Sequence, residues 1–217
     1  SDGIFKSTDG GETWHDITPW DIIPMRDWSD RKTLFVYSFA INPTDTKKIF
    51  AGTSEGVLRS VDSGNSWQLL GPSVLSINRL QAMSIEIDPV NNNTIYVGTN
   101  FFGIFKSEDE GNDWTQLSVK ASYVRAIAIN PQNSNEIFAE TFLNGLCKSE
   151  DGGNTWNQVE LPNGSNSYEI YAISYNPANL KTMFIVAWYY ISWYPPMFYP
   201  VFLESTDGGV TWKTTDT

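Results

Sequence analysis

The sequence predicts an all-β protein made of repeated four-stranded antiparallel units, and three observations lead to this prediction. An octapeptide of the pattern S-x-D-x-G-x-x-W occurs five times along the 217 residues. Alternating runs of apolar and polar residues surround the copies, as expected of strands with one buried face. No helical segment interrupts the repeat, and four strands in about 45 residues are typical of one β-propeller blade.

Each octapeptide is predicted to form the tip of a β-hairpin that joins the third and fourth strands of a blade. The strand before it alternates, as in residues 3–6 and 103–106. In the turn, the Asp side chain can accept hydrogen bonds from nearby backbone N–H groups, and the Gly can adopt a positive φ. The Trp then begins the returning strand. The five copies are residues 7–14, 60–67, 107–114, 149–156 and 205–212.

Two further strands are predicted before each of the last four hairpins. The first ends at an Asn-Pro or Asp-Pro turn, as in residues 39–43, and the second follows it, as in residues 49–53. The same pair recurs within residues 85–99, 127–141 and 173–187. The hairpin at residues 1–17 has no such pair before it.

The count gives a single domain over residues 1–217, a complete or partial propeller of about four and a half blades. It consists of a half blade at residues 1–17 and full blades at 34–70, 79–118, 122–160 and 168–214. Either the chain is a piece of a longer propeller, or its first blade stays two-stranded, or another chain completes that blade. Because an incomplete blade exposes a strand edge, we expect self-association there.

The octapeptide resembles the Asp-box, also called the BNR repeat, of sialidases, sortilin-type receptor domains, xyloglucan-cleaving glycosidases and many bacterial surface proteins. The resemblance covers nearly the whole chain and implies the propeller, but it says little about activity. In that family the Asp-box is a structural hairpin element. The resemblance therefore implies a structural role, without catalysis, for Asp9, Asp62, Asp109, Asp151 and Asp207 and for Trp14, Trp67, Trp114, Trp156 and Trp212.

Charge and composition exclude several functions. The chain has 14 Lys+Arg against 25 Asp+Glu, and this net charge of −11 disfavours nucleic acids and anionic membranes as partners. A single Cys and a single His argue against a disulfide and against a zinc site, so we expect no metal and no cofactor. The uncharged residues 182–203 are long enough to cross a bilayer. Their prolines and the repeat register predict two strands and a loop instead, with no membrane insertion.

The predicted topology places the Asp-boxes on one face of the propeller and the variable loops on the other, the loop face. Two loop-face segments are long, residues 18–31 and 188–199, and all tryptophans outside the Asp-boxes fall in them. Aromatic rings stack on sugars and anchor protein interfaces. In a ring of five blades the two segments would adjoin, although they can also simply cap the end of the propeller. The predicted ligand-binding residues are Trp20, Trp28, Trp188, Tyr190, Trp193, Tyr194 and Arg125.

A glycosidase needs two carboxylates about 5–10 Å apart. The catalytic candidates are Glu140, Asp27 and Asp30, and the loop face also carries Asp21 and Glu169. Glu140 occupies a position held by glycine in two other blades, and we expect a salt bridge with Arg125 at the channel rim. No run matches the arginine motif of sialidases, and xyloglucan-cleaving relatives resemble a double propeller.

The resulting prediction is a non-catalytic binding or assembly module, extracellular or on the cell surface, whose loop face binds a glycan or a protein. The alternative is a fragment of a xyloglucanase-like glycoside hydrolase acting on polysaccharide. A third possibility, an intracellular assembly factor with a hydrophobic or basic partner, agrees with the acidic charge but has no motif to support it.

Overall fold

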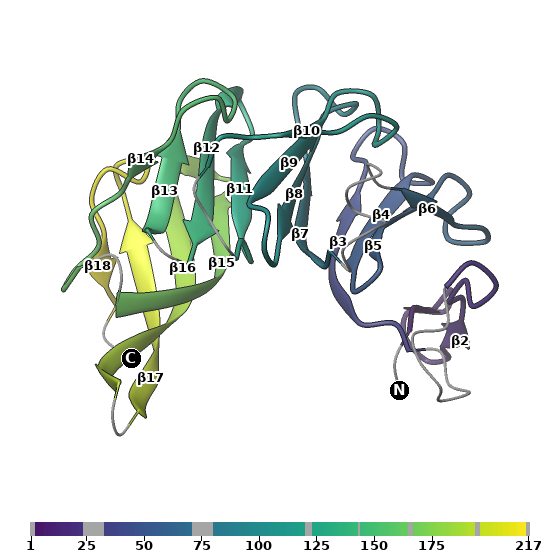
Figure 1. The fold of residues 1–217 in the computed structure, drawn as a ribbon, viewed down its shortest axis with the longest axis horizontal. Helices are drawn as coiled ribbons and strands as arrows, with labels where there is room; N and C mark the ends of the chain where they lie inside the picture. Colours follow the sequence, from purple (N-terminus) through teal and green to yellow (C-terminus); the bar gives the residue numbers. More distant parts are fainter. Residues whose placement is uncertain are drawn as a thin grey trace.

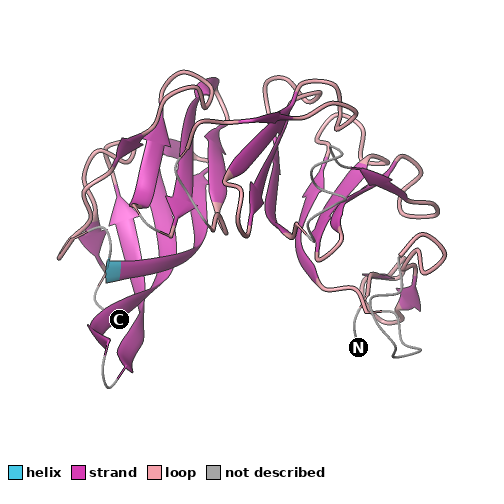
Figure 2. Ribbon diagram, in the orientation of Figure 1, coloured by secondary structure: helices cyan, strands magenta, loops and turns pink. Residues whose placement is uncertain are grey.

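The computed structural model describes residues 3–23, 33–70, 80–119, 123–142, 144–164, 167–193 and 196–215. These residues form five antiparallel sheets, one of two strands and four of four strands. The sheets follow one another along an open arc, and Figure 2 shows strands and connecting loops almost throughout. The prediction of an all-β, propeller-type fold is confirmed.

The sheets are numbered here as blades 1 to 5. Within each blade, strands that are consecutive in sequence are hydrogen-bonded neighbours. Blade 1 consists of β1 (Phe5–Lys6) and β2 (His15–Asp16). Blade 2 consists of β3 (Val36–Ile41), β4 (Ile49–Thr53), β5 (Gly56–Ser60) and β6 (Gln68–Leu70). Blade 3 consists of β7 (Ala82–Ile87), β8 (Ile95–Thr99), β9 (Ile104–Ser107) and β10 (Thr115–Gln116).

Blades 4 and 5 each have a longer second strand than blades 2 and 3. Blade 4 consists of β11 (Ile127–Asn130), β12 (Asn133–Thr141), β13 (Gly145–Ser149) and β14 (Asn157–Gln158). Blade 5 consists of β15 (Tyr168–Asn176), β16 (Asn179–Trp193), β17 (Pro196–Ser205) and β18 (Lys213–Thr214). In Figure 1 the Asp-box hairpins lie along the outer side of the arc, and the opposite turns lie along its inner side.

Each Asp-box turn is held by hydrogen bonds within the octapeptide. In blade 4, the Ser149 hydroxyl donates to Asp151 at 2.9 Å and accepts the Gly153 N–H at 2.8 Å. Asp151 also accepts the N–H and the hydroxyl of Thr155, at 2.8 and 2.6 Å. Trp156 closes the turn by donating its indole N–H to the Gly153 carbonyl at 2.9 Å. The carboxylate is therefore fully engaged within its own turn.

The Asp-boxes also join neighbouring blades. A Cβ added at Gly64 would lie 2.8 Å from Ile17, and one at Gly111 would lie 2.7 Å from Leu70, each in the preceding blade. The glycine in the turn therefore leaves the space that an apolar side chain of the previous blade fills. At Gly11 of blade 1, only Trp14 of the same turn comes within 4 Å. Accordingly, Trp14 is 62% exposed.

Both ends of the arc expose apolar side chains at positions that are buried in the inner blades. Phe39 and Ile41 of β3 are 51% and 55% exposed, whereas their counterparts Ile85 and Ile87 in β7 are 2% and 7% exposed. Phe39 and Ile41 line a groove of about 550 Å³ against blade 1. At the other end, Phe184 of β16 is 43% exposed. Among the described residues, blade 1 contains only β1 and β2, and they leave this face of β3 largely exposed.

One expectation about the loop face is wrong. Residues 188–199 are not a loop, because they extend β16 and β17 into a long hairpin with Tyr189 opposite Tyr199 and Tyr190 opposite Phe198. Aromatic residues favour such cross-strand pairs. Pro200 is tolerated because β18 pairs β17 only at Leu203 and Glu204, which leaves this part of β17 at a sheet edge.

The blades do not form the ring of five in which the two long loop-face segments would adjoin. The arc is open, and blade 1 and blade 5 lie at its opposite ends (Figure 1). Residues 18–23, the described part of the first long segment, therefore lie at the opposite end of the arc from residues 188–193 of the second. Among the residues described, no helix is long and apolar enough to cross a membrane.

Candidate functional site

A continuous line of aromatic side chains crosses blades 3, 4 and 5 on the loop face. We call it the aromatic strip. It begins at Phe101, in the turn between β8 and β9, whose ring centroid lies 5.4 Å from that of Tyr123. Tyr123 in turn contacts Phe142, in the turn between β12 and β13, at 5.8 Å. Phe101 and Phe142 are 58% and 52% exposed. The strip comprises Phe101, Tyr123, Arg125, Phe142, Glu169, Tyr171, Trp188, Tyr190 and Phe198.

Arg125 joins the blade 4 part of the strip to blade 5. Its guanidinium carbon lies 5.6 Å from the ring centroid of Tyr123 and 5.7 Å from that of Tyr171, so two rings flank the cation. The guanidinium forms an ion pair with Glu169 of β15. Glu169 also accepts a hydrogen bond from the Tyr190 hydroxyl, at 2.5 Å. These contacts hold the arginine in one position at the junction of the two blades.

The extended hairpin of blade 5 supplies the far end of the strip. Tyr190 contacts Phe198 at 5.8 Å between ring centroids, and Trp188 contacts the same ring edge-on at 4.8 Å. All three project from one face of the hairpin, because residues 188 and 190 alternate with 189 and Phe198 pairs with Tyr190. The hairpin thus extends the aromatic surface beyond the point where the equivalent strands of the other blades end.

Glu140 is buried beneath this surface. It is 1% exposed and accepts the backbone N–H of Arg125 at 3.0 Å. Burial raises the pKa of Glu140 to about 7, and its hydrogen bond and the charge of Arg125 offset only part of the increase. The expected side-chain salt bridge between Arg125 and Glu140 is wrong, because the long guanidinium reaches the neighbouring blade and pairs with Glu169.

This arrangement does not provide a pair of reactive carboxylates. A raised pKa is typical of a general acid, but the carboxyl group of Glu140 is sealed from solvent. Glu169 is neutralised by Arg125. Asp27 and Asp30, the other catalytic candidates, lie outside the described residues. In the part of the chain that the structure describes, no group of three or more His, Cys, Asp or Glu side chains is placed to hold a metal ion.

The structure brings Arg125, Trp188 and Tyr190 together, and it separates Trp20 from them. Trp20 is half-buried at the blade 1 end of the arc, where its indole N–H donates to Asp16 at 3.2 Å and its ring packs against a core cluster that includes Ile4. Its packing explains why an aromatic residue occurs there without joining the strip. Trp28 and Tyr194 lie outside the described residues, and Trp193 is the last residue of β16.

Sequence reasoning missed several residues of the strip. A signal was present for two of them, because Phe101 and Phe142 occupy short loop-face turns where blade 2 carries Ser54 and Glu55. Their exposed positions were therefore visible from the repeat alignment. Tyr123 and Tyr171 gave no such signal, since only the structure shows that they flank Arg125.

The fold and its repeated turns define an Asp-box β-propeller domain. The family model described as "Sortilin, neurotensin receptor 3" (Sortilin-Vps10) matches residues 102–217, just over half of the chain. The chain therefore belongs to the Sortilin-Vps10 family. Comparison with curated protein sequences finds no match.

Solved structures share the fold at low sequence identity. An ancestral GH74 enzyme is 23% identical with a TM-score of 0.67, over 84% of this chain and 24% of that chain. The extracellular domain of BT4673 from B. thetaiotaomicron is 15% identical with a TM-score of 0.61, over 85% of this chain and 24% of that one. YCF48 bound to D1 peptide is 17% identical with a TM-score of 0.55, over 98% and 76%. The chain thus spans about a quarter of the length of the GH74 enzyme, and these similarities concern the fold alone.

Proposed function

We propose that this propeller is a non-catalytic binding domain, outside the cell or on its surface, and that the aromatic strip binds a protein partner. The observation that carries the proposal is the exposure of Phe101 and Phe142 on either side of Tyr123, in one connected line of rings. Monomeric proteins rarely expose large apolar side chains in a contiguous patch unless the patch binds something. Tyr, Trp and Arg, which the strip also contains, are the residues most enriched in binding hot spots.

The ring geometry supports a protein partner over a glycan at this surface. The planes of Phe101 and Tyr123 meet at 58°, and those of Tyr123 and Phe142 at 64°. Successive rings are therefore tilted and form notches, whereas a sugar stacks on the flat face of a ring. Notches between tilted rings suit the insertion of apolar side chains from a polypeptide. A similar fold has been solved as YCF48 bound to D1 peptide, which agrees with this use of the fold.

The burial of Glu140 and the ion pair of Glu169 support a role without catalysis. The extracellular location is supported by the sortilin-type family and by the fold of the BT4673 extracellular domain. The second candidate function is polysaccharide hydrolysis, which the likeness to a GH74 enzyme brings into consideration.

The test uses a displayed library of short peptides and, in parallel, soluble xyloglucan. The double variant Phe101→Ser/Phe142→Ser removes the exposed rings, and both positions are exposed enough for the fold to persist. Phe5→Ser is the matched control, since Phe5 is 40% exposed on blade 1, away from the strip. We expect peptides selected on the wild type to lose at least about tenfold in affinity for the double variant, as hot-spot truncation does, and to bind the control unchanged.

Two results would overturn the proposal. Peptides that bind the double variant as tightly as the wild type would place the binding surface elsewhere. Release of reducing sugars from xyloglucan by the wild type would make the domain an enzyme. Binding of intact xyloglucan that is lost in the double variant would reassign the strip to a glycan.

A further inference from the structure

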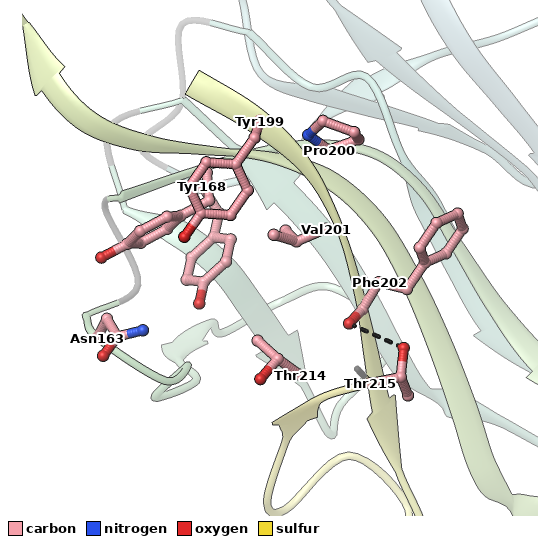
Figure 3. Close-up of a pocket in the computed structure, with 9 residues that line it drawn as sticks. Asn163, Tyr168, Tyr199, Pro200, Val201, Phe202, Thr214 and Thr215 are labelled. Carbon is pink, nitrogen blue, oxygen red and sulfur yellow. Dashed lines mark hydrogen bonds between the residues drawn. The ribbon is translucent and has the colours of Figure 1, made fainter. Parts of the chain in front are cut away.

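A second candidate site lies on the other face of the extended hairpin. A pocket of about 330 Å³ opens between β17, β18 and the turn at residues 161–164 (Figure 3). Its wall contains Tyr168, Tyr189 and Tyr199, one from each of three adjacent strands. Tyr189 and Tyr199 alternate with the strip residues along their strands, so they project from the opposite face. The pocket is therefore separate from the aromatic strip.

The three tyrosines form a row across the sheet. Tyr168 is opposite Tyr189, and Tyr189 is opposite Tyr199, with ring centroids 5.1 and 5.6 Å apart. Tyr168 is 6% exposed and donates its hydroxyl to the Pro162 carbonyl at 2.7 Å. Tyr199, at the open side, is 44% exposed. The row thus grades from an anchored ring at its base to an accessible ring at its mouth.

Asn163 is fixed on the opposite side by a tight turn. The turn is closed by the Gly164 N–H, which donates to the Leu161 carbonyl at 3.1 Å. Asn163 has a φ of 61°, a conformation that asparagine tolerates better than most residues. Figure 3 shows the side chains of Asn163 and Thr214 beside the opening of the pocket, facing the tyrosine rings.

The pocket offers hydrogen-bonding groups that the protein itself does not use. Within the described residues, the hydroxyls of Tyr189, Tyr199 and Thr214 make no hydrogen bond. A tyrosine or threonine hydroxyl both donates and accepts, and an asparagine amide adds donors and an acceptor. These groups surround aromatic ring surfaces in one concave space. A ligand that fits must combine an apolar face with several hydroxyl groups.

None of the described residues that line the pocket carries a charge. The lining therefore does not compensate an ionic ligand, and the net charge of −11 disfavours an anion in particular. The volume is at the small end of the range for ligand pockets, about 300 to 1,000 Å³, which suits one ring and not an enclosed chain. We propose that this tyrosine pocket binds one neutral saccharide unit, stacked on Tyr189 or Tyr199 and hydrogen-bonded by the hydroxyl and amide groups around it.

The experiment titrates unglycosylated protein, produced in a bacterial host, with neutral sugars such as glucose, galactose, mannose, xylose and N-acetylglucosamine, observed by NMR. The unglycosylated form matters because Asn163, Gly164 and Ser165 form an N-glycosylation sequence. Three variants accompany the wild type. Tyr199→Ala removes the accessible ring, and Tyr189→Phe removes one hydroxyl. Phe184→Ala is the matched control, because Phe184 is 43% exposed on the opposite face of β16 and outside the strip.

We expect saturable binding of at least one sugar. Tyr199→Ala should abolish it, Tyr189→Phe should weaken it about 5- to 10-fold, as the loss of one hydrogen bond does, and Phe184→Ala should leave it unchanged. The proposal is overturned if no neutral sugar binds, or if Tyr199→Ala and Tyr189→Phe bind as the wild type does. Because the strip variants do not touch this pocket, failure here leaves the proposed protein-binding function untouched.

Discussion

Replacing Glu140 with glutamine should change how the stability of the domain depends on pH. The side chain is 1% exposed, and burial raises its pKa from 4.5 to about 7. A carboxyl group with a raised pKa in the folded state favours folding fully below pH 4.5 and loses that contribution as the pH rises through 7. The difference in pKa corresponds to about 3 kcal/mol of unfolding free energy. As far as this group is concerned, the wild type should therefore be less stable at pH 8 than at pH 4.5.

The assay is urea denaturation of wild type and Glu140→Gln at pH 4.5, 6 and 8. Glutamine keeps an oxygen that accepts the Arg125 N–H and removes only the ionisation. We expect equal stability at pH 4.5 and an advantage of about 3 kcal/mol for the variant at pH 8. Glu160→Gln, at an exposed position, is the control and should follow the wild type at every pH.

Parallel pH profiles for the wild type and Glu140→Gln would refute this reasoning. Such a result would mean that solvent or Arg125 stabilises the ionised Glu140 in the folded state to the same extent as water does in the unfolded chain. Glu86, whose pKa burial also raises to about 7, contributes to the wild-type profile in the same direction. The difference between wild type and variant isolates Glu140 from that second group.

Three further predictions concern the Asp-boxes and the open end of the arc. Trp114 packs against a buried cluster that blades 2 and 3 share, so Trp114→Ala should lower the unfolding free energy by about 3 kcal/mol. Trp14→Ala, at a position 62% exposed, should lower it by less than about 0.5 kcal/mol. Equal losses in urea titrations would contradict a role of the Asp-box tryptophan in packing between blades. Hydrogen bonds from Ser66 hold the pKa of Asp62 at about 2, so the stabilisation by this carboxylate is present above pH 3.8 and lost as the pH falls towards 2. Asp62→Asn should therefore destabilise the domain at neutral pH and not at pH 2. Equal destabilisation at both pH values would count against this role of Asp62. The exposed face of β3 should drive concentration-dependent self-association, and Phe39→Lys/Ile41→Lys should abolish it. Analytical sedimentation measures the association, and a wild type that is monomeric at all concentrations would contradict this prediction.

Local sequence patterns predicted most of the fold because the determining interactions are local. The strand expected at residues 49–53 is β4 (Ile49–Thr53), and its alternation is set within five residues. The Asp-box is likewise closed by bonds between side chains and backbone no more than four residues apart, such as Ser149 with Gly153. Such features appear in one sequence without knowledge of the tertiary structure.

The extended hairpin was misjudged because two local signals conflicted. Prolines at 195, 196 and 200 indicated a loop, whereas the run from Trp188 to Ile191 has high β propensity. Proline has no backbone N–H, so the outcome depends on whether a neighbouring strand requires a hydrogen bond from that position. At Pro200 none does, because β18 pairs β17 only further along the strand. That information is tertiary and cannot be obtained from the segment itself.

The candidate site was only partly predictable for a related reason. Arg125 was selected from its position in the repeat, but its partner Glu169 is 44 residues away in the next blade. The separation of Trp20 from Trp188 depends on the openness of the arc, which depends on how many blades are present and how each is completed. Repeat periodicity gives the blade and leaves the curvature of the arc undetermined.

The concentration of both candidate surfaces in blade 5 has a single structural cause. In blades 2, 3 and 4 the turn between the second and third strands is short, so those blades end at the frame of the propeller. In blade 5 the same connection is replaced by five further cross-strand pairs between β16 and β17, from Trp188↔Pro200 to Trp193↔Pro196. Since side chains of a hairpin alternate between its faces, one extension places Trp188 and Tyr190 on the strip and Tyr189 in the pocket. Lengthening one hairpin of a repeated scaffold is therefore sufficient to create two distinct candidate binding surfaces without altering the repeat that holds the scaffold together.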